Sequence, residues 1–272
     1  MNKEIPLMRH PADARIHFSE LKLHAKSPAH VKLATEGARS ISDVMRIGGV
    51  ADSIVFQHGK GHVLYPGRRA GKEWESFQAE HPDTYIVIQS ELDRAEGDAQ
   101  AVLTSPAAMR VLGGCDFQQV MQWDAFGLPC AAGVKGQRGG FDALHRAKGE
   151  LNDLKVTSCT EPEALSRHAL NQLWHAQMAW YRWGARSLGQ TINVCRLVCV
   201  ESSPPHNVTV LRLPESWLVI GEKLITAWCD RHRACECAGA WPGYVQEEIE
   251  AIDPAWMAEG VDLVGLDEAP VE

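Results

Sequence analysis

The chain has 272 residues and a formal net charge of −8 at pH 7, and 45% of its residues are apolar while 23% are charged. This composition is that of a folded globular protein and excludes a mostly disordered chain. The acidic balance excludes a protein that coats nucleic acid through bulk positive charge, although it allows a local basic groove. Without a long apolar run or the apolar core of a signal peptide, the sequence predicts a cytoplasmic protein with no membrane contact.

The first third of the sequence has the spacing and the capping residues of helices. Ser19 can cap a short helix, and Ser27-Pro28 places proline at the first helical position, where its missing N–H costs nothing. Residues 63–69 are expected to form a loop or a short strand. Further helices are predicted over residues 40–57 and 90–101 and from Ser105 onward.

The middle of the sequence changes to the alternating hydrophobicity of strands. Strands are predicted over residues 116–123, 128–134, 141–144, 150–157, 192–201 and 207–213. Thr160 and Glu163 have the spacing of a capping box, which predicts a helix that ends near Trp183, before Gly184. A last helix is expected over residues 215–237. This order predicts a mixed α/β (α+β) fold, in which helices flank a central mixed sheet and a helical region precedes it.

Two carboxylates and a lysine form the strongest candidate for a catalytic site. Asp153 and Lys155 alternate with Leu154 along one predicted strand, so their side chains should project from the same face. Asp142 lies 11 residues before Asp153, which suits two adjacent antiparallel strands. The three polar side chains would meet at a point suited to Mg²⁺, which prefers oxygen ligands. The lysine would orient or deprotonate a water molecule, or stabilise the charge of a phosphate.

A pair of polar residues on the next predicted helix strengthens this interpretation. Gln177 and Tyr181 are four residues apart, so they share a helix face beside the apolar stripe of that helix. Their polar ends could reach a phosphate or a base next to the metal centre. The simpler alternative is that Asp153 and Lys155 form an ordinary salt bridge on an edge strand, because so short a motif is common.

Together these residues resemble the PD-(D/E)xK nuclease superfamily, and specifically its RecB-like branch with a QxxxY motif after the catalytic strand. Other segments are similar, in sequence and in order, to phage and prophage exonucleases of the exodeoxyribonuclease VIII (RecE) type. These segments are residues 16–22, 26–30, 45–52, 71–74, 200–206 and 241–244. The resemblance implies a restriction-endonuclease-like core in one nuclease domain over residues 15–258, between a flexible N-terminus (1–14) and a flexible acidic tail (259–272).

The resemblance also implies the ligands of a metal ion. Asp142, Asp153 and the carbonyl group of Leu154 would bind Mg²⁺, with Mn²⁺ as an alternative ion. Asp52 stands where the family usually has histidine. A carboxylate can bind a hard cation at least as naturally as an imidazole, so Asp52 is retained as a candidate ligand.

The remaining site residues would act on the DNA. By the same resemblance, Lys155 would be the catalytic lysine, and Gln177 and Tyr181 would position DNA or support the metal centre. A basic strip that could follow the DNA backbone consists of Lys60, Arg68, Arg69, Lys72, Lys135 and Arg138. An ordinary solvated loop is the alternative interpretation of that strip.

The family resemblance implies a Mg-dependent exodeoxyribonuclease that degrades one strand of linear double-stranded DNA, in the 5′→3′ direction, and leaves single-stranded tails for phage recombination. It implies a ring of identical subunits and a single-strand annealing partner in the host cytoplasm. Two alternatives stay open: a single-strand or flap nuclease on the same fold, and a non-catalytic DNA-binding protein with a decayed site. The first would have an iron–sulfur cluster, although the spacing of its candidate ligands fits a cluster poorly. Those candidates are Cys195 or Cys199 with Cys229, Cys235 and Cys237.

Overall fold

The computed structural model describes residues 15–36, 42–57, 61–138, 149–245 and 247–248. Within these ranges, six strands form the main sheet and two more form a small parallel pair. The main sheet contains β1 (Ile16–His17), β4 (Asp116–Ala125), β5 (Leu128–Arg138), β6 (Gly149–Thr157), β7 (Ile192–Glu201) and β8 (Val208–Arg212). The small pair consists of β2 (His62–Leu64) and β3 (Tyr85–Val87).

The main sheet is mixed, as the sequence predicts. Strand β5 runs antiparallel to β4 and β6, β6 and β7 run parallel, and β8 is antiparallel to β7. Strand β1 is parallel to β5 and pairs with Cys130 and Ala131, whereas β6 pairs with β5 further along, at residues 136–138. Because β4 occupies the other edge of β5 at both places, β1 and β6 share one edge of β5 and leave a stretch of it between them.

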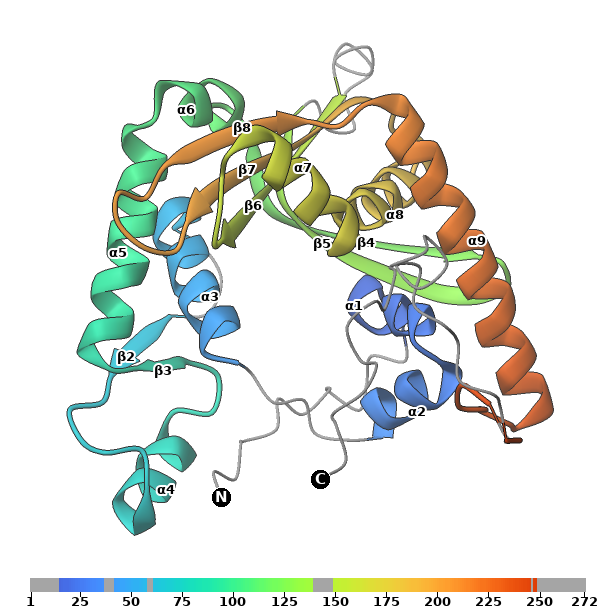
Figure 1. The fold of residues 1–272 in the computed structure, drawn as a ribbon, viewed down its shortest axis with the longest axis horizontal. Coiled ribbons are helices and arrows are strands. Elements are labelled where there is room, and N and C mark those ends of the chain that lie inside the picture. The colour runs from blue at the N-terminus through green and yellow to red at the C-terminus, as the bar shows by residue number, and fades with distance from the viewer. Residues whose placement is uncertain (1–14, 37–41, 58–60, 139–148, 246, 249–272) are drawn as a thin grey trace, which may run out of the picture.

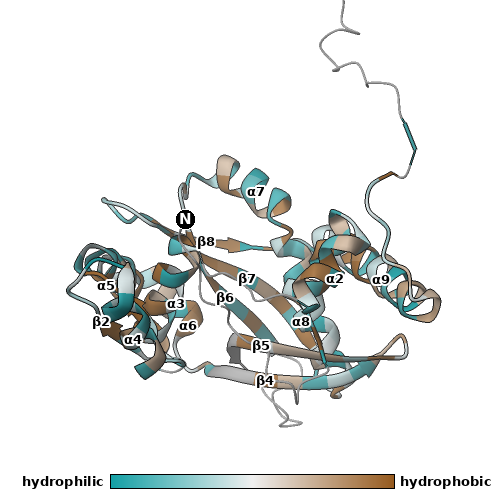
Figure 2. Ribbon diagram, turned by 90° about the horizontal axis from the view of Figure 1, so that it is seen from below, coloured by the Kyte–Doolittle hydropathy of each residue, from teal (hydrophilic) through white to brown (hydrophobic). Residues whose placement is uncertain are grey.

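Helices cover both faces of this sheet (Figure 1; Figure 2 gives a perpendicular view). In chain order they are α1 (Phe18–Leu21), the 3₁₀ helix η1 (Lys22–Ala25), α2 (Pro28–Glu36), α3 (Asp43–Phe56), α4 (Gly71–Glu80), α5 (Gln89–Thr104), α6 (Pro106–Leu112), α7 (Pro162–Asn171), α8 (Trp174–Ser187) and α9 (Glu215–Ala238). Helices α7, α8 and α9 share a core with Leu151 and Leu197, whereas α3, α5 and α6 pack on Leu154 and Val198. Side chains of adjacent strand residues therefore pack in cores on opposite faces of the sheet, as strand geometry requires.

Two predictions for the segment after β6 are wrong. The sequence predicts one continuous helix there, but α7 and α8 are separate, because Leu173 adopts a left-handed backbone conformation with φ of 60°. The predicted capping box is also replaced by another cap. The carboxylate of Glu161 accepts hydrogen bonds from the N–H groups of Glu163 and Ala164 at 3.1 and 2.7 Å. A carboxylate at this position satisfies amides that have no partner within the helix.

Two residues that were expected at helix ends lie inside helices. Ser19 is the second residue of α1, and His17 takes the N-cap position. Gly184 lies within α8 instead of ending it. A β-carbon at Gly184 would come within 2.6 Å of the Trp123 ring, so glycine is needed here for close packing and not for a left-handed turn.

The sequence did not predict β1, β3 or α4. The two strands are short, and their extended conformation depends on pairing with residues distant in the sequence. Helix α4 has no buried residue, so its sequence shows no apolar stripe. The predicted strand over residues 141–144 lies outside the described residues. Within the part of the chain that the structure describes, no helix is long and apolar enough to cross a membrane.

Candidate active site

Asp153 and Lys155 lie on the face of β6 that α8 covers, as their alternation predicts. Lys155 Nζ is 2.7 Å from Asp153 Oδ2, and the side chains are 15% and 0% exposed. A buried carboxylate is costly unless a charge or hydrogen bonds offset its desolvation, and the ammonium group provides that compensation here. Because β6 pairs with both β5 and β7, the alternative of a salt bridge on an edge strand is wrong.

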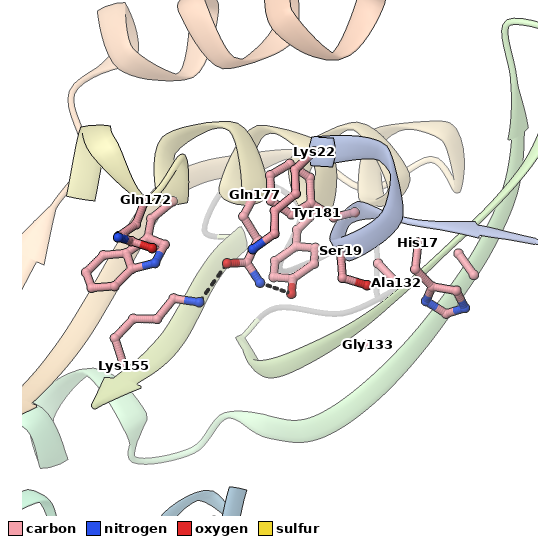
Figure 3. Close-up of a pocket in the computed structure, with 12 residues that line it drawn as sticks. His17, Ser19, Lys22, Ala132, Gly133, Lys155, Gln172, Gln177 and Tyr181 are labelled. Atoms are coloured by element: carbon pink, nitrogen blue, oxygen red, sulfur yellow. Dashed lines mark hydrogen bonds between the residues drawn. The ribbon is translucent and has the colours of Figure 1, made fainter. Parts of the chain in front are cut away.

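Helix α8 extends this pair into a chain of hydrogen bonds (Figure 3). Lys155 Nζ donates to Gln177 Oε1 at 2.6 Å, and Gln177 Nε2 donates to the Tyr181 hydroxyl at 2.6 Å. An ammonium group cannot accept a hydrogen bond, so the amide oxygen must face Lys155 and the amide nitrogen must face Tyr181. The helix face that their spacing predicts is therefore confirmed. Lys155 Nζ also lies 5.5 Å from the centre of the Trp174 ring, a cation–π distance.

Asp52, on α3, influences the same cluster through its charge. Burial raises the pKa of the Tyr181 hydroxyl well above its usual range, and the charge of Asp153 raises it further. The hydrogen bond from Gln177 lowers that pKa, and the charge of Asp52 raises it again. Tyr181 is therefore protonated at neutral pH and keeps a hydrogen to donate. Two carboxylates that are distant in the sequence both act on this one buried hydroxyl group.

The oxygen donors around Tyr181 suit a hard divalent cation. Asp52 and Asp153 offer carboxylates, and both oxygens of Asp153 are buried. The Leu154 side chain packs in the core on the opposite face, so its carbonyl group is the part that can serve the site. Asp142 lies outside the described residues. Among the residues that are described, no three of the His, Cys, Asp and Glu side chains are grouped as a metal site, so they supply only part of the predicted ligand set.

Lys155, Gln177 and Tyr181 of this cluster form one wall of a pocket of about 230 Å³. The start of the described chain contributes His17, Ser19 and Lys22, and β5 contributes Ala132 and Gly133 (Figure 3). No motif or spacing in the sequence predicts His17, Ser19 or Lys22 as site residues. Their only signal was a place in segment 16–22 of the family resemblance, because no spacing along the chain connects them to residue 155.

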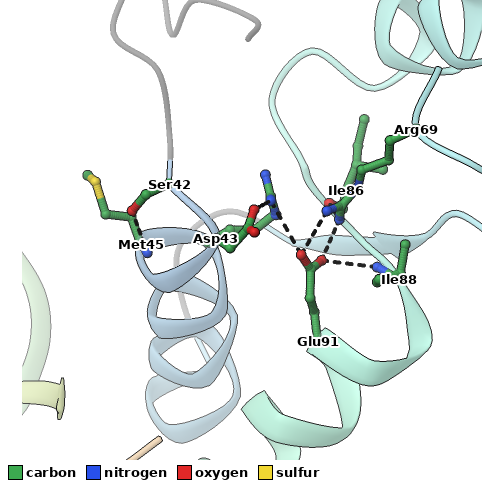
Figure 4. A network of polar contacts seen from close by, with 8 residues as sticks. Ser42, Asp43, Met45, Arg69, Ile86, Ile88 and Glu91 are labelled. Atoms are coloured by element: carbon green, nitrogen blue, oxygen red, sulfur yellow. Dashed lines mark hydrogen bonds and ion pairs between the residues drawn. The ribbon is translucent and has the colours of Figure 1, made fainter. Parts of the chain in front are cut away.

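The predicted basic strip contains one arginine with a clear structural role (Figure 4). Arg69 Nη1 donates to Glu91 Oε1 at 2.7 Å, and its Nη2 donates to the other carboxylate oxygen and, at 2.8 Å, to the Ile86 carbonyl. Arg46 Nη2 reaches the same carboxylate at 3.3 Å. Burial would raise the pKa of Glu91, but these cations and the Ile88 N–H lower it below its usual value. Arg69 therefore connects α5 to the β2–β3 region.

Two other members of the basic strip, Arg68 and Lys72, do not line the pocket. Arg68 and Lys72 are exposed, and Lys60 lies outside the described residues. Lys135 and Arg138 belong to β5, but the structure does not describe their side chains. The DNA-binding role of these residues stays a prediction.

The cysteines that would hold an iron–sulfur cluster are not assembled into one. Four of them, Cys195, Cys199, Cys229 and Cys235, are buried, and Cys237 is exposed. All five belong to the described chain, in which no group of three potential ligands occurs. Burial raises the pKa of the Cys229 thiol to about 12, as expected for a thiol that packs as a small apolar group.

Residues 17–254 match the family described as a PDDEXK-like domain of unknown function (DUF3799). The chain belongs to this family. The matched range includes all of the main sheet except the first residue of β1, and it contains the whole Asp153–Lys155–Gln177–Tyr181 cluster. The resemblance to the PD-(D/E)xK superfamily, and the mixed sheet flanked by helices that it implies, are therefore confirmed for this PDDEXK-like protein.

A solved structure shows the same fold. The crystal structure of a protein from Eubacterium rectale, described as a "Putative exonuclease", has a TM-score of 0.60 and 12% sequence identity, over 92% of this chain and 94% of that chain. At this identity the likeness shows the fold alone. A structure of SSO0001 has a TM-score of 0.36 and 11% identity, over 80% of this chain and 78% of that one, and is too dissimilar to inform the site. No curated protein matches the sequence.

Proposed function

We propose that this PDDEXK-like protein is a metal-dependent exodeoxyribonuclease that degrades one strand of linear double-stranded DNA in the 5′→3′ direction. The observation that carries the proposal is Lys155, which is held between Asp153 and Gln177 on the wall of a pocket. The family match and the fold shared with a protein described as a "Putative exonuclease" support it. The single-stranded tails that it leaves would serve phage recombination.

The side chains of the cluster have complementary tasks. Gln177 accepts one hydrogen of the Lys155 ammonium group, and Asp153 balances its charge at 2.7 Å. A remaining hydrogen of this group would serve a phosphate oxygen or the attacking water. Gln177 fixes the position of that ammonium group, and protonated Tyr181 supplies a further donor. This arrangement stabilises the negative charge that develops on a phosphodiester during attack.

The same cluster fits a divalent cation. Asp52, Asp153 and the carbonyl group of Leu154 would hold Mg²⁺ or Mn²⁺, because hard cations take oxygen ligands. Such an ion supplies charge neutralisation and a water of lowered pKa. Lys155 would then assist the nucleophile from the side of the pocket that it lines.

Cleavage of end-labelled DNA tests the proposal. Linear duplex labelled at either the 5′ or the 3′ end, and a closed circular duplex, are incubated with the protein in Mg²⁺ or in EDTA. We expect Mg²⁺-dependent loss of linear DNA only, with early release of the 5′ label. Asp153→Ala and Lys155→Ala should abolish it, whereas the exposed control Lys223→Ala should not.

Three other outcomes would contradict parts of the proposal. Cleavage of the circle would indicate an endonuclease, and early release of the 3′ label would reverse the direction. The absence of cleavage by the wild-type protein with any divalent metal, while DNA binding persists, would indicate a non-catalytic binding protein. Circular dichroism of each variant separates a lost site from a lost fold.

The ring of identical subunits and the annealing protein are also proposed as partners. An exonuclease that encloses its duplex stays bound between successive cleavages, which suits the production of long tails. Native mass spectrometry of the full chain should show a closed oligomer, and a monomer at working concentrations would contradict the ring.

A further inference from the structure

The break between α7 and α8 lies at the wall of the catalytic pocket. At the end of α7, the Gln172 N–H donates to the His168 carbonyl at 2.8 Å. At the start of α8, the Gln177 N–H donates to the Leu173 carbonyl at 3.0 Å. Leu173 itself has a φ of 60°, a left-handed conformation that costs free energy in a residue with a β-carbon. The two residues beside it, Gln172 and Trp174, both line the pocket, so the strained turn occurs at the candidate site.

The new helix start also determines which side chains of α8 face the pocket. Trp174, Gln177 and Tyr181 are separated by three and then four residues, so they form one stripe along α8. All three line the pocket. Gln177 and Tyr181 belong to the chain of hydrogen bonds that begins at Lys155, and Trp174 is the third member of the stripe.

The ammonium group of Lys155 has three partners of different chemistry. The Asp153 carboxylate lies 2.7 Å from it, the Gln177 amide oxygen accepts a hydrogen bond from it at 2.6 Å, and it lies over the Trp174 ring, 5.5 Å from the centre. The face of an indole ring attracts a cation, yet its N–H is only a donor. The ring therefore holds the ammonium group without neutralising the charge as a second carboxylate would.

The Trp174 ring is itself fixed by the helices around it. The His168 ring of α7 meets it edge-on, with the ring centres 5.2 Å apart and the planes at 82°. Trp174 is half-buried and packs against the core that α7, α8 and α9 share. A side chain whose position is already fixed can hold a flexible lysine at a small cost in entropy.

We infer that Trp174 is a positioning residue for the reaction. The face of its ring keeps the charged ammonium group of Lys155 at the wall of the pocket, and the left-handed turn at Leu173 puts the ring there. The inference rests on the proposed function, which it deepens by assigning a residue that sets the position of the catalytic lysine together with Asp153 and Gln177. Trp174 acts through Lys155 and not through a bond to the DNA.

The chemical reactivity of Lys155 tests this inference without DNA. The full chain in EDTA is treated with a limiting amount of acetic anhydride, and mass spectrometry measures the acetylation rate of Lys155 relative to that of the exposed Lys223. Only the uncharged amine attacks the reagent, so loss of a ring that stabilises the cation should speed the reaction. Trp174→Leu should raise the relative rate about fivefold, whereas Trp174→Phe, which keeps an aromatic face, should stay within about twofold of the wild type.

Cleavage kinetics in Mg²⁺ provide a second measurement. Trp174→Leu should lower kcat about tenfold and change KM less than about twofold, because the ring contacts the lysine and not the DNA. Trp174→Phe should recover most of kcat. The matched control is Trp183→Leu: Trp183 is another half-buried tryptophan of α8, packs on Phe126 with the ring centres 4.8 Å apart, and does not line the pocket. It should change neither the acetylation rate nor kcat, and circular dichroism checks the fold of each variant.

The outcomes separate this inference from the proposed function. Faster acetylation and a lower kcat in Trp174→Leu, both reversed in Trp174→Phe, support it. Equal acetylation rates in Trp174→Leu and Trp183→Leu overturn it, whether or not the wild-type protein cleaves DNA, and so does faster acetylation with an unchanged kcat. A raised KM with unchanged acetylation also overturns it and indicates that the ring stacks on a DNA base. A protein that shows the acetylation effect but never cleaves DNA keeps the contact that positions Lys155 and loses the proposed exonuclease.

Discussion

Two buried carboxylates in this protein are paired with cations, and they differ in whether protein groups occupy all the hydrogen-bonding positions of their clusters. Glu91 accepts from both terminal nitrogens of Arg69, from Arg46 and from a backbone N–H group. Asp153 is paired with Lys155, whose ammonium group also serves Gln177 and lines a pocket. The residue types are similar, but one cluster is closed by its own partners and the other opens onto a space that a ligand can enter.

The difference indicates which cluster serves the fold and which serves chemistry. The Glu91 cluster joins α3, the β2–β3 region and α5, so each of its contacts fixes one element against another. The Asp153 cluster has an ammonium group and a tyrosine hydroxyl group that can donate hydrogen bonds to a substrate. Substitutions in the first cluster should therefore lower stability, and substitutions in the second should lower activity.

The largest effect is expected from Lys155→Met. Loss of the ammonium group should reduce DNA cleavage by about a thousandfold, the magnitude typical of removing one preorganised donor to a transition state. The free energy of unfolding should also fall, by up to about 3 kcal/mol, because the buried Asp153 carboxylate is left without its counter-charge. Initial cleavage rates and urea unfolding measure the two quantities. If the variant is less stable but cleaves DNA at the wild-type rate, this cluster supports only the fold, as the Glu91 cluster does.

Glu91→Gln should lower stability but leave cleavage almost unchanged. A neutral amide leaves two partly buried guanidinium groups without their carboxylate, and the free energy of unfolding should fall by about 3 kcal/mol. Cleavage per folded molecule should stay within about twofold of the wild-type rate, since Glu91 does not line the pocket. Urea unfolding, followed by cleavage assays well below the unfolding midpoint, distinguishes these effects. A large loss of rate in the folded variant would contradict a purely structural role for Glu91.

The buried pair of His24 and His232 extends the comparison to a cluster without a buried carboxylate. Burial, then the charges of His232 and Arg231, lower the pKa of His24 from 6.5 to about 4. The unfolded chain therefore binds a proton below pH 6.5 that the folded chain binds only near pH 4, so stability falls as the pH drops through this range. The other charged groups near the pair are Glu236, 3.5 Å from His232, and Lys32, which lies over the Trp241 ring.

The expected size of this effect is about 2 kcal/mol of unfolding free energy between pH 7.5 and pH 5. Urea unfolding of the wild-type chain and of His24→Gln at both pH values measures it, since the variant lacks the titrating group. The variant should be less stable at pH 7.5 and should lose about 2 kcal/mol less on acidification. An equal pH dependence in both proteins would show that His24 titrates normally.

The smallest effect is expected at the exposed ion pair of Arg167 and Glu163 on α7. Their side chains are 65% and 79% exposed, so water and salt screen the attraction. Arg167→Ala should change the free energy of unfolding by less than about 0.5 kcal/mol and leave cleavage unchanged. If urea unfolding shows that the free energy of unfolding falls by more than about 1 kcal/mol, solvent exposure does not make this ion pair weaker than the buried clusters.

The sequence predicts most of the central elements, and its errors occur where tertiary contacts override local signals. The break between α7 and α8 is absent from the prediction because Leu173 is an ordinary helix former that here adopts a left-handed conformation. Gly184 looks like a helix stop, but it is required where the Trp123 ring approaches α8. In both cases the cause lies in packing that residue spacing does not reveal.

The sequence by itself determined the local pairings of the site. Alternation along a strand places Asp153 beside Lys155, and the helical repeat places Gln177 beside Tyr181, because backbone geometry alone sets these neighbours. Only the family resemblance predicts that these two pairs belong to one site. Their actual contact, between Lys155 and Gln177, required α8 to pack on β6.

Only the tertiary structure decided which distant residues join or leave that site. Asp52 acts on Tyr181 from α3, and Lys22 reaches the pocket because β1 pairs with β5 beside β6. Arg69, predicted to contact DNA, forms an ion pair with Glu91, and its contact with DNA stays a prediction. These outcomes depend on how elements far apart in the chain pack and pair, and residue spacing describes only neighbours within one element.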